Sequence, residues 1–135
     1  MSSVIPGRVD LLFVKGCDFS KGIVVAKFDR DEYEPDMTAA EVQALPSYSL
    51  VDLSVATFAE AVGRASTDDD TEVWKLELGA GFTPGNGSID LEMAKADVNA
   101  LEIGSAEWSA RVTVGGVTDC YLIGSYQVLQ GASHD

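Results

Sequence analysis

The chain has 135 residues, 46% of them hydrophobic, and a formal net charge of −13 from 22 acidic and 9 basic residues. This length predicts a single domain, and this composition is ordinary for a globular protein, so neither disorder nor a membrane span is indicated. The acidic excess argues against nucleic acid as a partner, because such binding depends mainly on Lys and Arg that neutralise phosphates.

The first residues, Met-Ser-Ser-Val-Ile-Pro-Gly-Arg, have neither the basic start nor the apolar stretch of a secretion signal. We therefore expect synthesis in a cytoplasm, with residues 1–8 as an N-terminal arm. Cys17 and Cys120 could meet across a two-layered fold. In a reducing compartment we expect instead two buried thiols that act as small apolar side chains.

Residues 9–15 and 19–28 are rich in Val, Ile, Leu and Phe and are interrupted by Gly16 and Gly22. This pattern predicts two strands that pair as neighbours. An inserted loop over residues 29–48 follows, and its first part is too charged to contribute to a core.

Within this loop, Thr38-Ala-Ala-Glu41 has the spacing of a capping box, and Pro46 ends whatever begins there. We expect a helix of about two turns, with Val42 and Leu45 turned inward and support from the rest of the fold.

Residues 50–65 are compatible with either a helix or a strand, and the alternation of Val51, Leu53 and Val55 favours a strand. A polar, acidic turn over 66–70 is expected next. Residues 71–78 then predict a strand whose one face carries Trp74, Leu76 and Leu78.

Residues 79–87 have the composition of a glycine-rich loop, with Phe82 exposed at its centre. A strand over 88–93 follows, and a short helical turn over 95–101. The inward-facing residues predicted for this strand are Ile89, Leu91 and Met93.

The last two strands are expected to reverse at Gly115-Gly116, with Trp108, Ala110, Val112 and Val114 facing inward. A two-residue turn would place Tyr121 and Ile123 on that face, whereas one extra residue would place Cys120 and Leu122 there. We favour the second register, because it forms an inward stripe from Leu122 through Tyr126 to Val128 and places Gly124 opposite Trp108. Residues 130–135 are polar and are expected to form a loose tail.

The sequence predicts no catalytic residue, metal ligand or cofactor site. The single histidine, His134, is next to last, and neither cysteine has a ligand partner at metal-binding spacing. A calcium loop beginning at Asp29 fails, because Glu34 occupies the glycine position and Ala40 the position of the bidentate Glu. A pair of carboxylates could still meet in space, so sequence alone does not test glycosidase chemistry.

Three aromatic residues, Tyr33, Tyr48 and Phe82, fall in predicted loops and are the candidate interface residues. They could cover the ends of the core, anchor a protein partner, or stack on a sugar.

Several segments together resemble the immunoglobulin-like β-sandwich modules of tailed bacteriophage virions, in particular the N-terminal domain of baseplate upper proteins and tail or head accessory proteins. The resemblance is carried by Lys15-Gly-Cys-Asp-Phe19, Val51-Asp-Leu-Ser-Val-Ala56, Gly87-Ser-Ile-Asp-Leu-Glu-Met93, Ala96-Asp-Val-Asn-Ala-Leu101 and Leu122-Ile-Gly-Ser-Tyr-Gln-Val128. It implies a mainly β, antiparallel sandwich with one or two short helical turns, formed by a single domain over residues 1–135.

The resemblance also implies a function. We expect a non-enzymatic virion subunit of the tail, baseplate, collar or capsid, made in the host cytoplasm. Its expected partners are other virion proteins, with copies repeated by symmetry and with neither nucleic acid nor membrane bound. Specificity would lie in the arm and the inserted loop. The alternative is a carbohydrate-binding module that uses Tyr33, Tyr48 or Phe82 as stacking platforms.

Overall fold

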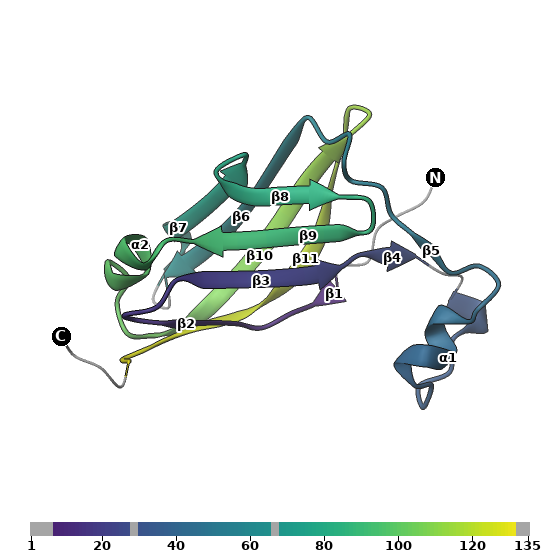
Figure 1. The fold of residues 1–135 in the computed structure, drawn as a ribbon, viewed down its shortest axis with the longest axis horizontal. Coiled ribbons are helices and arrows are strands. Elements are labelled where there is room, and N and C mark those ends of the chain that lie inside the picture. Colours follow the sequence, from purple (N-terminus) through teal and green to yellow (C-terminus); the bar gives the residue numbers. More distant parts are fainter. Residues whose placement is uncertain (1–6, 28–29, 66–67, 132–135) are drawn as a thin grey trace.

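The computed structural model describes residues 7–27, 30–65 and 68–131. It shows a mainly β protein with two short α-helices (Figure 1), and the predicted fold class is confirmed at this level. The strands are β1 (Gly7–Arg8), β2 (Leu11–Val14), β3 (Phe19–Val24), β4 (Ala26–Lys27), β5 (Ser49–Leu50), β6 (Phe58–Ala65), β7 (Asp68–Leu78), β8 (Gly81–Gly85), β9 (Ser88–Met93), β10 (Gly104–Val114) and β11 (Val117–Leu129). The helices are the 3-10 turn η1 (Arg30–Glu32), α1 (Ala39–Gln43) and α2 (Lys95–Asn99).

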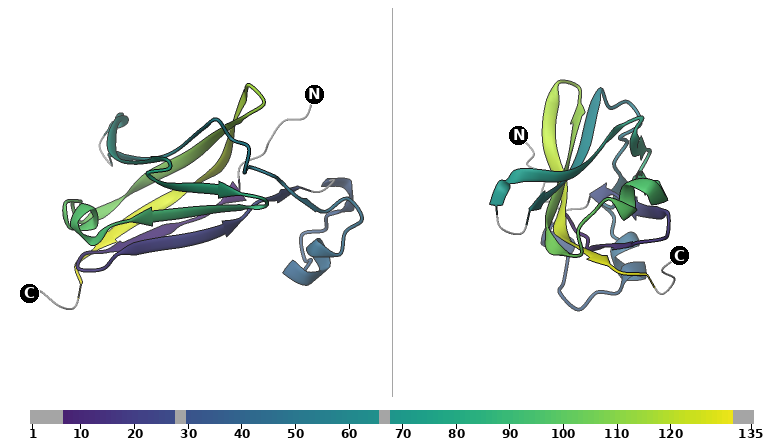
Figure 2. Two further views of the ribbon diagram at one scale, coloured as in Figure 1. Left: turned by 45° about the horizontal axis from the view of Figure 1, so that its top comes forward. Right: turned by 90° about the vertical axis from the view of Figure 1, so that its left-hand side faces the viewer.

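One sheet contains nine of the described strands, in the order β1-β11-β10-β6-β7-β8-β9-β3, with β2 also paired to β11. β1 and β2 run parallel to β11, and β8 runs parallel to β7, so the sheet is mixed rather than wholly antiparallel. β4 and β5 pair with each other in a separate two-stranded sheet. The main sheet curls, so that β3, β8 and β9 lie over β6, β10 and β11 (Figure 2).

The core lies inside this curl and is centred on aromatic rings. Phe13 of β2 packs against Phe19 of β3 with ring centroids 4.4 Å apart. The Trp74 ring lies 5.3 Å from Phe13 and 6.4 Å from Trp108. Strands from both sides of the curl contribute rings, and full burial of an apolar side chain is worth about 1.5–3 kcal/mol. Packing of these rings therefore holds the curl together.

The alternation predicted for two strands agrees with the burial of their side chains. In β7, Trp74 and Leu76 are buried, but Leu78, the last residue of the strand, is exposed. The inward-facing residues of β9 are, as expected, Ile89, Leu91 and Met93.

The ambiguous segment 50–65 is extended rather than helical. Its second half forms β6, a central strand paired with both β7 and β10, so the strand interpretation is confirmed there. Its first half is held by a bridge from Asp52 to Asn86, with Leu53 buried and Val55 exposed. The acidic turn expected over 66–70 is shorter than predicted, because β7 already begins at Asp68.

The prediction that the first two apolar segments pair with each other is wrong. β2 pairs with β11, and β3 pairs with β9, so the link between them crosses from one side of the curl to the other. Gly16 makes this turn at φ +94°, and the Cys17 amide donates to the Val14 carbonyl at 3.1 Å. Local alternation does not distinguish such an arch from a hairpin, because both place Phe13 and Phe19 in the core.

The prediction of a loop over residues 79–87 is also wrong for the middle of this segment. Residues 81–85 form β8, which pairs antiparallel with β9, and Phe82 is fully buried rather than exposed. Gly79 and Gly81 adopt φ +79° and +95°, which allows the chain to turn directly after β7. A Cβ on Gly81 would lie 2.6 Å from the Glu92 carbonyl oxygen. Glycine here permits close strand packing, which composition alone does not distinguish from a loop.

The hairpin of β10 and β11 has the predicted register, reached by a different route. Gly115 and Gly116, with φ +61° and +81°, form a two-residue turn without an extra residue. The extra residue is Tyr121, which the pairing skips at a bulge, so that Ala110 faces Leu122 and Trp108 faces Gly124. Cys120 consequently lies opposite Arg111 rather than on the inward stripe.

Gly124 permits the N-terminal strand to approach β11. A Cβ on Gly124 would overlap the Val9 carbonyl oxygen. That oxygen accepts a hydrogen bond from Trp108 Nε1 at 2.8 Å, so the core is linked to the point where β1 ends. Asp10 Oδ1 accepts from the Ser125 amide at 3.1 Å, so this amide of β11 has a hydrogen-bond partner between β1 and β2, where strand pairing is interrupted.

Both predicted helices form, but α1 is not part of the core. Its capping box is present: the Glu41 amide donates to Thr38 Oγ1, and the Thr38 amide donates to Glu41 Oε1, both at 3.2 Å. No residue of α1 is buried, and Val42 and Leu45 are only half-buried, so the prediction that they turn into the core is wrong. Figure 1 shows α1 beyond β4 and β5, away from the curled sheet.

The two chain ends are partly described. Of the predicted arm, Gly7 and Arg8 form β1, whereas residues 1–6 lie outside the described residues. Of the predicted tail, Gly131 is buried, and a Cβ on it would overlap the Lys15 carbonyl oxygen. Residues 132–135, with the sole histidine, lie outside the described part.

Candidate docking surface

Concave sites are shallow in this fold. One depression of about 380 Å³ lies over β10, β11 and β2, and is lined by Asp10, Leu11, Leu12, Ser105, Ser125, Tyr126 and Gln127. A second, of about 330 Å³, is lined by Asp18, Phe19, Ser20, Glu92, Met93 and Ala94. In the latter, Asp18 Oδ1 already accepts from the Lys95 amide at 2.7 Å, at the start of α2. Within residues 7–27, 30–65 and 68–131, no three His, Cys, Asp or Glu side chains gather as they would to hold a metal ion.

The three candidate interface residues do not share one surface. Phe82 is fully buried in the core, which corrects its placement in an exposed loop. Tyr33 is 43% exposed and Tyr48 is half-buried, and both belong to the inserted loop. The loop aromatics available at the surface are therefore reduced to one tyrosine and part of another.

The inserted loop has a local structure that fixes the position of these tyrosines. We call its described part, residues 30–48, the insert. Glu32 Oε1 accepts hydrogen bonds from the Ser47 amide at 3.2 Å and from Ser47 Oγ at 2.7 Å, which joins the two ends of the insert. The Met37 amide donates to the Glu34 carbonyl at 3.0 Å and makes the turn before α1. The insert is thus a folded projection rather than a random loop.

Apolar and acidic side chains mix on the insert. Its apolar members are Tyr33, Met37, Val42, Leu45 and Tyr48, and all except Tyr33 are half-buried. These side chains are not among those that pack against the main core. Leu50, at the base of the insert, is 49% exposed. Over residues 29–48 the sequence has six acidic side chains and one basic. The insert therefore presents apolar groups inside an acidic surround.

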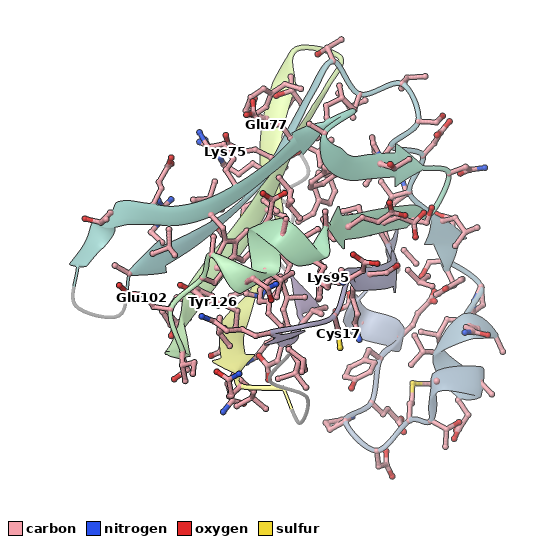
Figure 3. All side chains as sticks on the ribbon, turned by 60° about the vertical axis from the view of Figure 1, so that its left-hand side comes forward. Cys17, Lys75, Glu77, Lys95, Glu102 and Tyr126 are labelled. Carbon is pink, nitrogen blue, oxygen red and sulfur yellow. The ribbon has the colours of Figure 1, made fainter. Side chains whose placement is uncertain are left out.

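A network of ion pairs covers the outer side of the central strands, and sequence reasoning did not find it. Glu60 of β6, only 7% exposed, pairs with Arg111 of β10 and lies 3.7 Å from Lys75 Nζ of β7. Lys75 Nζ also lies 3.3 Å from Glu72, which lies 3.8 Å from Arg64. Figure 3 shows Lys75 and Glu77 side by side on β7, away from the core. We call the five residues of these ion pairs the ladder: Glu60, Arg64, Glu72, Lys75 and Arg111.

The electrostatics of the ladder follow from its geometry. The hydrogen bond and charge of Glu72 raise the pKa of the Lys75 ammonium group, with smaller contributions from Glu60 and Glu77. Val62, which shares this outer side of β6, is almost fully buried. Long Lys and Arg side chains cover apolar surface with their alkyl stems while keeping their charges in water. Each charge of the ladder thus has a partner, and the ladder covers this side of the sheet.

Sequence contains only part of the signal for this network. Glu60 and Arg64 alternate along one strand, and Glu72 and Lys75 lie on the next, as the printed sequence shows. Their contact requires β6 to lie between β7 and β10, and that order is set by distant pairings. A list of charged residues without the strand order does not predict which of them meet.

Two further polar arrangements have structural roles. Hydrogen bonds from the Ser54 side chain and amide lower the pKa of Asp52. The Ser54 amide donates to Asp52 Oδ1 at 2.9 Å. Burial raises the pKa of Tyr126, whose hydroxyl donates to the Arg64 carbonyl at 2.7 Å. Both arrangements stabilise local backbone conformation.

The expectation of two buried thiols is wrong for Cys17 and is met only in part for Cys120. Cys17 is exposed at the arch between β2 and β3 (Figure 3), and Cys120 is half-buried on β11. Both are free thiols. The arch exposes Cys17, because its neighbour Gly16 carries the chain around the edge of the core rather than through it.

Among the described residues, no helix has the length and apolar character needed to cross a membrane. No protein-family model matches the chain. A search of curated proteins returns no significant match.

Proposed function

We propose that this chain is a non-enzymatic structural component of a bacteriophage virion, a tail, baseplate, collar or capsid accessory subunit that docks onto a larger symmetric assembly. The observation that carries this proposal is the insert. It is folded by its own capping box and by the bonds between Glu32 and Ser47, yet α1 buries no residue against the sheet. A folded projection that adds nothing to the core is a feature expected of a docking element.

The curled sheet supports the same role. We propose that it is a variant of the immunoglobulin-like sandwich, with β3, β8 and β9 as one layer and β6, β7, β10 and β11 as the other. The buried rings between these layers favour a rigid frame, on which a projecting loop keeps a fixed position. Rigidity suits a subunit that is repeated many times by symmetry.

The charge of the chain fits this proposal as well. A net charge of −13 keeps copies apart in solution by mutual repulsion. Assembly then depends on a partner that neutralises part of this charge. Such a subunit would remain monomeric until it meets its site on the growing particle, which is made in the host cytoplasm.

The alternative role in carbohydrate binding has less support. Of the three aromatic residues considered as stacking platforms, Phe82 is buried and Tyr48 is half-buried. A sugar-binding surface generally places exposed rings beside polar groups in a concave site. The contacts of the described residues therefore favour the structural role over carbohydrate binding.

Mass spectrometry of purified phage particles tests the proposal. We expect peptides of this chain in a fixed ratio to the major virion proteins, retained through density-gradient purification. Electron microscopy of particles labelled with an antibody against the chain would then locate the copies. Consistent absence of the chain from intact particles, with no binding of the purified chain to any virion component, would refute the role.

A further inference from the structure

Three surfaces of the fold could receive a partner, and two of them are poorly suited to docking. The outer side of β6, β7 and β10 is covered by the ladder, in which Glu60 and its neighbours are already paired with one another. A partner would have to break these pairs, and leaving the largely buried Glu60 without a cation would be costly.

The open edge of the sheet is the second surface. β3 ends the path of paired strands and offers backbone groups on its free side. Lys21 lies between Phe19 and Ile23, at a position that faces inward by alternation, yet it is exposed. A charged residue that points inward at an edge strand is a known protection against strand addition. The edge is therefore guarded.

The insert is the third surface, and it lacks both forms of protection. Its apolar side chains pack outside the main core, and Tyr33 is 43% exposed. Around them lie acidic residues, of which Glu34 and Asp36 are exposed. Removing the apolar groups from water would favour binding, and the acidic surround would select the charge of the partner.

We propose that the insert docks into an apolar hollow rimmed by Lys and Arg on a different protein of the assembly. This inference rests on the proposed virion role and specifies the chemistry of the partner. The acidic surround requires a basic rim, because like charges across an interface are strongly unfavourable. The apolar side chains require a hollow that removes them from water.

A second copy of this chain does not provide such a rim. Of its 9 basic residues, Arg8, Arg64, Lys75 and Arg111 are held in ion pairs, and Arg30 belongs to the insert itself. The other four, Lys15, Lys21, Lys27 and Lys95, belong to a chain with a net charge of −13, so two copies repel each other. The occupant is therefore another protein, and the copies of this chain are arranged by that protein's symmetry.

Zero-length crosslinking in purified particles is the first test. A carbodiimide joins carboxylates only to amines that they touch, and residues 28–48 contain no lysine that would consume their carboxylates internally. We expect crosslinks from Glu34 and Asp36 to lysines of a single other virion protein. Crosslinks from these residues to lysines of this same chain would favour self-association and overturn the proposal. So would crosslinks that arise only from other surfaces.

A competition for incorporation is the second test. Phage grown in a host that co-expresses tagged variants would incorporate wild-type and variant chains in a ratio read by mass spectrometry. Glu34→Lys with Asp36→Lys should lower incorporation by about tenfold, because it places like charges against the basic rim. The matched control is Asp90→Lys with Glu92→Lys on β9, which makes the same charge change on exposed residues of the sheet and should incorporate as wild type.

A second pair of variants tests the apolar part. Tyr33→Ser removes the exposed ring and should lower incorporation by about fivefold, since aromatic anchors often carry much of the binding energy. The control is Ile103→Ser between α2 and β10, where the side chain is 58% exposed and follows the insert by more than 50 residues. Figure 1 shows α2 at the opposite end of the sheet from α1. Urea unfolding of the purified variants establishes that all are folded.

The outcomes separate this inference from the proposed function. If the chain is present in particles and the insert variants incorporate as well as their controls, the docking mode is wrong while the virion role stands. If the chain is absent from particles, both are wrong. Selective loss with the insert variants, together with crosslinks to one other protein, supports both.

Discussion

The curled sheet and the insert are held together by different kinds of contact. The sheet is fixed by distant pairings, such as β1 with β11 and β3 with β9, and by rings contributed from both sides of the curl. The insert is fixed by hydrogen bonds within it, between residues 3 to 15 positions apart. The sheet can therefore keep its structure whatever the insert does, which leaves the insert able to vary with a binding role.

The difference can be tested by changing one contact at a time. Substitutions in the sheet should affect global unfolding, because the strands form one cooperative unit. Substitutions in the insert should affect local opening more than global stability.

The largest effect is expected for Gly124→Ala. The new Cβ would overlap the Val9 carbonyl oxygen, and the backbone of β1 and β2 would have to move away from β11. This movement would also break the bond from Trp108 Nε1 to that oxygen. We expect a loss of about 3 kcal/mol or more in the free energy of unfolding, as for other overpacked sites. Urea denaturation followed by tryptophan fluorescence measures it.

Gly7→Ala is the matched control for this change. Gly7 also lies where the N-terminal strand meets β11, but a Cβ there would lie 3.8 Å from Leu122, an ordinary contact. We expect a change within about 0.5 kcal/mol. Equal effects of the two substitutions would show that the close approach at Gly124 is not what links β1 and β2 to the sheet.

Substitution of Glu60 should have the next largest effect. Glu60→Ala leaves Arg111 and Lys75 without their shared carboxylate and removes a largely buried side chain. Arg111 and Lys75 remain partly exposed and can be solvated, so we expect a loss of about 1–2 kcal/mol rather than the larger cost at a fully buried pair. A double-mutant cycle with Arg111→Ala isolates the pair, and a coupling near zero would contradict its structural role.

The contrast between the two regions also explains what the sequence could predict. The capping box of α1, the stripe of Ile89, Leu91 and Met93, and the opposition of Trp108 and Gly124 were predicted correctly. Each depends on neighbours along the chain or on one hairpin. Local pattern is sufficient where the partners are local.

The errors share a different cause. The pairing of β2 with β11, the burial of Phe82 and the exposure of α1 all depend on segments distant in sequence. Amino-acid composition does not distinguish a glycine that allows close strand packing from a glycine in a loop. Of the candidate interface residues, the sequence therefore located the insert tyrosines but not Phe82, and it did not reveal the ladder.

Tyr126→Phe should have a smaller effect that depends on pH. It removes the hydrogen bond to the Arg64 carbonyl, which predicts a loss of about 1 kcal/mol near neutral pH. Burial raises the pKa of Tyr126, so the fold favours the neutral phenol. That contribution is complete below the ordinary tyrosine pKa of about 10 and is lost as pH rises through the raised value.

The wild-type chain should accordingly lose more stability than Tyr126→Phe between pH 9 and roughly pH 12. Tyr121, whose pKa is also raised by burial and by Asp119, remains in the variant and leaves part of the slope. Urea midpoints measured across this range give the comparison. Parallel curves for the two proteins would mean that Tyr126 ionises equally well in the folded state.

The smallest global effect is expected for Thr38→Ala, the change confined to the insert. It removes the hydroxyl that accepts from the Glu41 amide, and loss of such a cap costs a helix about 1 kcal/mol. Because no residue of α1 is buried, the insert can open without exposing core, so global unfolding should change by less than about 0.5 kcal/mol. Hydrogen exchange should accelerate severalfold at the amides of Val42 and Ala44, which donate within the helix, and stay unchanged in β10. Equal loss of protection in both places would mean that the insert and the sheet unfold as one unit, and that the insert does not open independently of the sheet.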